Sequence, residues 1–63
     1  MKIQLRSQVL IDGKVIGQAT EDLAPDTFEY VRERSNIAEV KFQKINSEAI
    51  ASATDVYDKK FKE

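Results

Sequence analysis

The dipeptide Asp12-Gly13 constrains the fold of this chain more than any other feature, because an alternating polar and apolar segment lies on each side of it. Asp-Gly between two such segments is a strong signal for a two-residue turn that joins antiparallel strands. It predicts a β-hairpin over residues 1–20 with the cross-strand pairs Ile11 with Lys14, Leu10 with Val15 and Val9 with Ile16. The alternation places apolar side chains on one side of the hairpin, which we expect to be buried: Ile3, Leu5, Val9, Ile11 and Ile16.

The other side of the predicted hairpin is more polar. Its residues are Gln4, Arg6, Gln8 and Ala19, with Leu10 and Val15 forming a small apolar spot near the turn. Gly17 interrupts the second strand, and a glycine inside a strand marks a bulge or the close approach of another backbone. We therefore expect an irregularity of the hairpin near Gly17.

A helix is predicted to begin near Asp26. Pro25, Asp26 and Glu29 together are typical of a helix start, and the Asp26 side chain can cap the first turn. Glu29 lies three residues further on, where a reciprocal cap forms. Both acidic side chains also favour the positive end of the helix dipole.

The extent of the helical region is open to two interpretations. In one, residues 37–45 form a third strand, because Ala38, Val40 and Phe42 alternate with polar residues, and the fold is ββαβα. In the other, residues 26–62 are mostly helical, with breaks that could fall near 35–36 and 46–47. Helix-favouring residues dominate this stretch. We therefore predict an α+β fold, an N-terminal β-hairpin followed by a mostly helical C-terminal half, and keep ββαβα as the alternative.

Size limits what such a chain can bury. Its 63 residues contain no cysteine, so we expect one small domain, residues 1–63, without disulfide bonds. A core of that size barely offsets the entropy of ordering the chain, and a second copy could supply the missing apolar contacts. Apolar positions that recur in steps of three and four offer a surface for self-association or for a partner: Phe28, Val31, Ala38, Phe42, Ile45 and Ala49. Tyr57 and Phe61, four positions apart, form a second candidate patch.

Enzymatic chemistry has little support in the sequence. Without His or Cys there is neither an imidazole base nor a thiol nucleophile, and the serines lie in no Gly-x-Ser-x-Gly motif. Gly13 and Gly17 match no phosphate-binding loop. The acidic residues before the helix lack the density and the glycine of a calcium loop. We therefore predict no enzyme activity, no cofactor and no metal site.

Nucleic-acid binding is the alternative function. Basic residues on both halves of the chain could contact phosphates: Arg6, Arg32, Arg34, Lys41 and Lys44. The 10 basic and 11 acidic residues give a net charge of −1, and acidic blocks separate the basic residues along the chain. This interleaving is more typical of solvated surfaces than of a nucleic-acid interface.

Protein binding is the function class that the sequence leaves best supported. We predict a non-enzymatic interaction module that self-associates and acts as an adaptor, an assembly factor or an inhibitor, of the compact kind common in phages and mobile elements. No apolar run approaches the roughly 18 residues of a membrane span, and no secretory signal is visible. We expect a cytoplasmic protein whose partner is itself or another protein and not a membrane.

Overall fold

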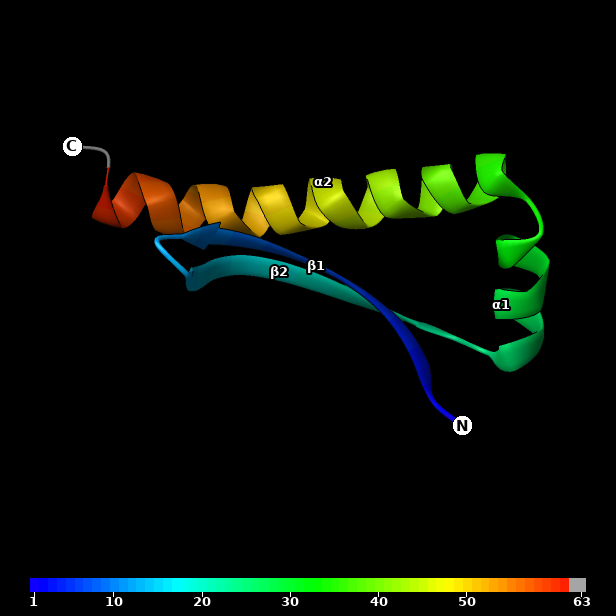
Figure 1. The fold of residues 1–63 in the computed structure, drawn as a ribbon. Helices are drawn as coiled ribbons and strands as arrows, with labels where there is room; N and C mark the ends of the chain where they lie inside the picture. The colour runs from blue at the N-terminus through cyan, green and yellow to red at the C-terminus, as the bar shows by residue number, and fades with distance from the viewer. Residues whose placement is uncertain (62–63) are drawn as a thin grey trace.

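The computed structural model describes residues 1–61 and contains two strands followed by two helices. The elements are β1 (Ile3–Ile11), β2 (Lys14–Leu23), α1 (Pro25–Arg32) and α2 (Ser35–Lys60). The predicted α+β fold, a hairpin followed by a helical half, is confirmed. Figure 1 shows α2 running along one face of the hairpin, while α1 connects the end of β2 to the start of α2.

The hairpin turn forms where the sequence predicts it. Asp12 and Gly13 both have positive φ, 50° and 82°, as a type I′ turn requires. The predicted pairs Ile11 with Lys14 and Leu10 with Val15 are confirmed, and the hairpin extends beyond residue 20 to Leu23.

Beyond these two pairs the predicted register is wrong by one residue in β2. Val9 pairs with Gly17 and not with Ile16, because a β-bulge leaves Ile16 without a partner. The bulge moves every later residue of β2 to the other face. Ala19 therefore pairs with Ser7 and is half-buried on the side that faces α2, so its predicted place on the opposite side is wrong.

Helix α1 begins one residue earlier than its predicted cap. Ala24 is the N-cap and makes no side-chain bond, which places Asp26 inside the first turn. The Asp26 carboxylate accepts a hydrogen bond from the Thr27 backbone N–H at 3.0 Å, and Glu29 pairs with Arg32 instead of reaching back. The reciprocal cap is thus wrong, although Asp26 still lies near the positive end of the helix dipole.

The helical region breaks once, between Arg32 and Ser35, slightly before the predicted position. Arg34 has an extended backbone there and precedes the first turn of α2. Helix α2 continues without interruption through residues 46–47, so that second predicted break is wrong. Residues 37–45 are helical, and the alternative third strand is also wrong. The last residue of the predicted helical region, Lys62, lies outside the described residues.

The core is a narrow contact between α2 and the hairpin. Among residues 1–61, five hydrophobic residues are buried, Leu23, Val31, Ile45, Ala49 and Ala53, and Gly17 is buried with them. A Cβ atom added to Gly17 would lie 2.4 Å from the Ala53 backbone nitrogen and 2.7 Å from the Ala49 carbonyl oxygen. Only glycine fits at this point, because the backbone of α2 rests directly on β2. Gly17 indicated either a bulge or the close approach of another backbone, and the structure has both.

Two polar contacts fix the rotation of α2 about its axis. On one flank, the Lys41 ammonium donates a hydrogen bond to the Glu21 carboxylate of β2 at 2.9 Å. On the other flank, the Ser7 hydroxyl of β1 donates to the Asn46 side-chain oxygen at 2.6 Å. One flank of α2 therefore lies over β2 and the other over β1. Within residues 1–61, no helix is long and apolar enough to cross a membrane.

Candidate functional site

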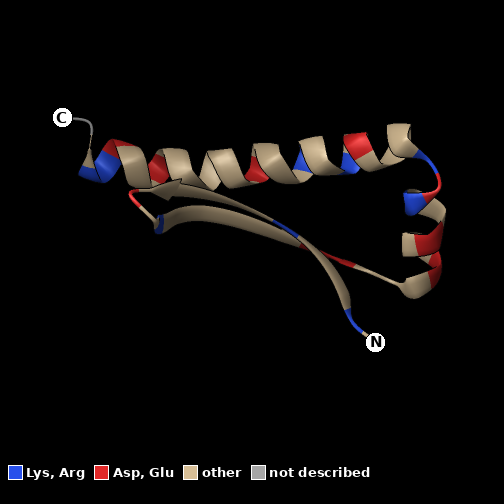
Figure 2. Ribbon diagram, in the orientation of Figure 1, with Lys and Arg blue, Asp and Glu red and all other residues tan. Residues whose placement is uncertain are grey.

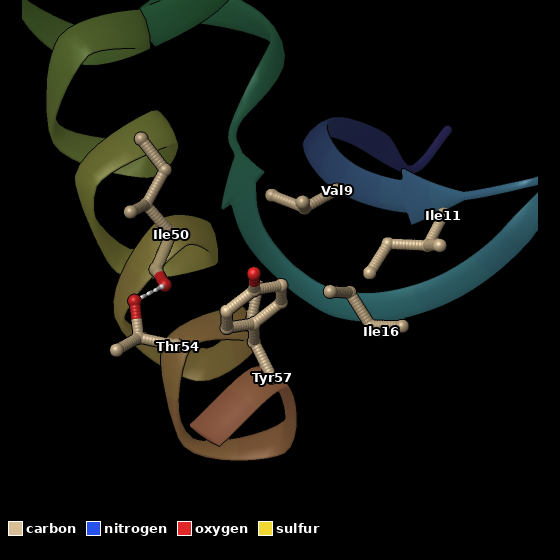
Figure 3. A pocket seen from close by; sticks show the side chains of 7 residues that line it. Val9, Ile11, Ile16, Ile50, Thr54 and Tyr57 are labelled. Atoms are coloured by element: carbon tan, nitrogen blue, oxygen red, sulfur yellow. Dashed lines mark hydrogen bonds between the residues drawn. The ribbon is translucent and has the colours of Figure 1, made fainter. Parts of the chain in front are cut away.

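An open apolar groove lies between α2 and the turn end of the hairpin, with a volume of about 310 Å³. Figure 3 shows side chains from both strands and from α2 around it. The lining residues are Val9, Ile11, Ile16, Ile50, Ala53, Thr54 and Tyr57. The Thr54 hydroxyl donates a hydrogen bond to the Ile50 carbonyl oxygen at 2.8 Å, so the helix already uses it. The groove therefore suits apolar side chains better than a polar ligand.

Helix α2 approaches β2 closely at Gly17, and the groove lies beside this contact. Small residues at the contact, Gly17 against Ala49 and Ala53, let the helix backbone approach β2 directly. The same approach leaves β1 incompletely covered. Val9 and Ile11 point toward the helix from alternate positions of β1 and form one wall of the groove.

We call the side of α2 above β1 the β1 flank and define it as Phe42, Asn46, Ile50 and Tyr57. The spacing of four, four and seven residues places these side chains on one side of a helix. The bond from Ser7 to Asn46 shows that this side lies above β1. Its three large side chains are poorly covered: Phe42 is 46% exposed, Ile50 57% and Tyr57 47%.

The structure divides the predicted self-association surface into two groups. Val31, Ile45 and Ala49 are buried within the chain and form its core. Phe28 and Ala38 are half-buried, and Phe42 is exposed. The recurring apolar spacing thus marks mainly the face that α2 turns toward its own hairpin.

The second predicted patch lies beside the groove. The rings of Tyr57 and Phe61 stack with their centroids 5.8 Å apart and their planes at 30°. Phe61 is half exposed at the C-terminal end of α2, and Tyr57 also lines the groove. The two aromatic residues therefore extend the apolar surface of the β1 flank.

Sequence reasoning missed several groove residues as a site, namely Val9, Ile11, Ile16, Ile50 and Thr54. The hairpin residues among them were predicted only as part of a buried face. A usable signal was the spacing of Ile50, Thr54 and Tyr57 along one side of the helix. This spacing indicates one side of a helix, but it identifies a wall of the groove only together with the position of α2 on the hairpin.

The predicted basic residues do not gather into one patch. Arg32 pairs with Glu29 at 2.9 Å, and Lys41 is engaged by Glu21. The Arg34 guanidinium lies 3.8 Å from the ring centre of Tyr30. The remaining two, Arg6 on β1 and Lys44 on α2, are exposed on separate elements. Figure 2 shows basic and acidic segments interleaved along the chain, and nothing in this arrangement favours the nucleic-acid alternative.

The acidic residues at the end of β2 and in the first turn of α1 each have a partner. Glu21 binds Lys41, the Asp22 carboxylate accepts a hydrogen bond from the Gln4 amide at 2.8 Å, and Asp26 accepts one from the Thr27 backbone. Across residues 1–61, no group of three or more acidic side chains is arranged to hold a metal ion. These carboxylates contribute to the local structure of the connection.

Comparison with known proteins adds no further guide to the site. No protein-family model matches the chain, and neither curated proteins nor solved structures give a significant match. The function must therefore be inferred from the chain's own surface, whose main feature is the apolar groove beside the β1 flank.

Proposed function

We propose that this chain is a non-enzymatic protein-interaction module that associates with itself. The observation that carries the proposal is the amount of exposed surface. The chain exposes 4938 Å², whereas a compact monomer of 7.2 kDa exposes about 4,100 Å². The excess of about 800 Å² equals what one partner contributes to a protein–protein interface of standard size.

The shape of the molecule explains this excess. Its radius of gyration is 14.1 Å, against about 11 Å for a compact chain of 63 residues. Its extents are 45 × 24 × 16 Å. A two-stranded sheet under one long helix has two open edges and little core, and a second copy would supply cover that this chain does not supply to itself.

The exposed surface also has the right composition for binding. Nine large hydrophobic residues are exposed: Met1, Leu10, Val15, Tyr30, Val40, Phe42, Ile50, Tyr57 and Phe61. Four of them, Phe42, Ile50, Tyr57 and Phe61, lie on or beside the β1 flank, and two of these, Ile50 and Tyr57, line the groove. Contiguous apolar surface of this kind marks interaction sites, whereas single exposed residues do not. The same surface could serve an adaptor, an assembly factor or an inhibitor that also binds another protein.

Light scattering coupled to size-exclusion chromatography tests the proposal over a range of concentrations. We expect the full chain to reach at least twice 7.2 kDa as its concentration rises. Ile50→Asp should keep the chain monomeric, because it would require burying a charge in the interface. The matched control is Val40→Asp, 64% exposed on a different side of α2, which should associate as the parent does. A Kd of about 1 mM corresponds to a free energy of association of only about −4.1 kcal/mol. A parent chain that remains at 7.2 kDa at this concentration would therefore refute self-association.

A further inference from the structure

The two edges of the hairpin differ in how well they are protected. Strand β1 runs for nine residues without a bulge or a proline and carries one charge, Arg6. Strand β2 has a bulge at Ile16 and carries Lys14, Glu21 and Asp22. Bulges and charged residues are the means by which proteins keep sheet edges from pairing. The edge of β1 is therefore the one suited to pair with another strand.

We propose that β1 pairs edge to edge and antiparallel with β1 of a second copy, forming a continuous four-stranded sheet with the two β1 flanks side by side. This inference rests on the proposed self-association and specifies its geometry. The strand order would be β2-β1-β1-β2, with both α2 helices on the same face. Two helices on one face of a four-stranded sheet form a complete two-layer structure.

The free backbone groups of β1 are suited to this pairing. Ile11 and Lys14 flank a two-residue turn and form a hydrogen-bonded pair, so Ile11, Val9 and the alternate residues before them bond to β2. The bulge lies in β2, so the alternation along β1 is unbroken. The residues in between direct their N–H and C=O groups to the open edge: Gln4, Arg6, Gln8 and Leu10.

Antiparallel pairing of two identical strands places a two-fold axis between the copies. The register with the most favourable side-chain pairs has Ser7 on this axis. All nine residues of β1 then pair, and Leu5 faces Val9 of the second copy on the side toward α2. On the opposite side, Arg6 faces Gln8 of the second copy. A register with Arg6 on the axis would place two guanidinium groups opposite each other, which is unfavourable.

The two helices fit above this sheet. Strands lie about 4.8 Å apart, so the two copies of β2 would be about 14 Å apart, and helices pack at about 8–10 Å. Because Asn46 binds Ser7, the middle of the β1 flank lies close to the axis. Phe42 of one copy would then lie near Ile50 of the other, since each is four residues from Asn46. The β1 flank contains no charged residue, so no like charges oppose this contact.

The test is site-specific cross-linking of the full chain, which contains no native cysteine. Ser7→Cys places a thiol on the axis, at a pair whose Cβ atoms lie about 4.5–5.5 Å apart. Ala19→Cys is the matched control, because Ala19 pairs with Ser7, faces the same side and is also half-buried. We expect Ser7→Cys to form a covalent dimer under mild oxidation or with a short bis-maleimide. Ala19→Cys should remain largely uncoupled.

A second pair of variants tests the edge without using Ser7, whose replacement removes a bond to Asn46. Gln8→Pro removes an N–H from the open edge of β1, and Gln18→Pro does so at the edge of β2. Both variants lose the same bond between the Gln8 and Gln18 side chains, so they are matched. We expect Gln8→Pro to weaken association at least tenfold by light scattering, and Gln18→Pro to leave it near the parent value.

The outcomes separate this inference from the proposed function. A parent chain that stays monomeric would refute both the proposed self-association and the pairing through β1. A parent that associates, with Ala19→Cys coupling in place of Ser7→Cys or with Gln18→Pro as the weaker associator, retains self-association and overturns pairing through β1. If Ser7→Cys fails to fold by circular dichroism, the proline pair decides the question alone.

Discussion

The two sides of α2 meet the hairpin in opposite ways. Over β2 the contact is made by the smallest residues, with Gly17 against Ala49 and Ala53, and the helix backbone rests on the strand. Over β1 the helix presents Phe42 and Ile50, and each remains about half exposed. Because α2 lies directly against β2, its contact with β1 is looser.

This difference divides α2 into one side that is closely packed and another that is largely exposed. One helix about 10 Å wide can cover a single strand closely or two strands loosely. The small residues select close contact with β2, and the apolar side chains of β1 and of the β1 flank then border an open groove. We infer that the tight side stabilises the chain, while the open side is available to a second copy.

Replacing Gly17 should disrupt the contact between β2 and α2 and cause the largest loss of stability. Gly17→Val would place its Cβ 2.4 Å from the backbone of α2, which a side-chain rotation cannot relieve. We expect a loss of about 3 kcal/mol or more, comparable with the whole stability of a chain of this size. Thermal unfolding followed by circular dichroism would then show an unfolded chain or a midpoint lowered by roughly 12–24 °C.

The control for this change is Thr20→Val, at an exposed position of the same strand. It should alter stability by no more than about 0.5 kcal/mol. If the two variants unfold at the same temperature, the contact of Gly17 with α2 is not what holds the helix in place.

Truncating one isoleucine on each side of α2 compares how much the two sides contribute to the free energy of unfolding. Ile45 is 1% exposed, so Ile45→Ala should lower the free energy of unfolding by about 2–4 kcal/mol through lost burial and an unfilled cavity. Ile50 is 57% exposed, so Ile50→Ala should lower it by less than about 1 kcal/mol in a dilute, monomeric sample. Urea denaturation measures both. Equal losses at the two positions would show that the β1 flank contributes to the monomer's core.

The turn between the strands offers a smaller and purely local effect. Gly13 has a φ of 82°, and an added Cβ would meet no atom within 4 Å. Gly13→Val should therefore cost about 1–2 kcal/mol through backbone strain alone. Asp12→Asn is the matched control, because asparagine also accepts positive φ. A thermal midpoint of Gly13→Val equal to that of the parent would contradict the requirement for glycine at this turn.

Local signals in the sequence predicted the local parts of the fold. Asp12-Gly13 located the turn and its first two cross-strand pairs, and Pro25 located the start of α1 within one residue. The cap at Asp26 was wrong because the helix begins at Pro25, which leaves Ala24, a residue without a capping side chain, at the N-cap position. The bulge was indicated by Gly17, but the shift of Ala19 to the other face followed only from the observed register.

The candidate site was predictable only in part. The spacing of Phe42, Ile45 and Ala49 predicted an apolar helix face, and two of these three residues proved to be buried in the chain's own core. The spacing does not say whether such a face meets its own hairpin or another copy. The groove joins residues of β1 to residues of α2 about forty positions later in the chain, and no local pattern connects them.

The sequence by itself determined the hairpin turn and the elements on either side of it, because turn preference and side-chain alternation act over a few residues. It also determined the lack of His and Cys chemistry. Only the tertiary structure decided how α2 is rotated and displaced, because that depends on the contact of Gly17 with Ala49 and Ala53, more than thirty residues away. The same contact decided which apolar residues of α2 became core and which remained at the surface.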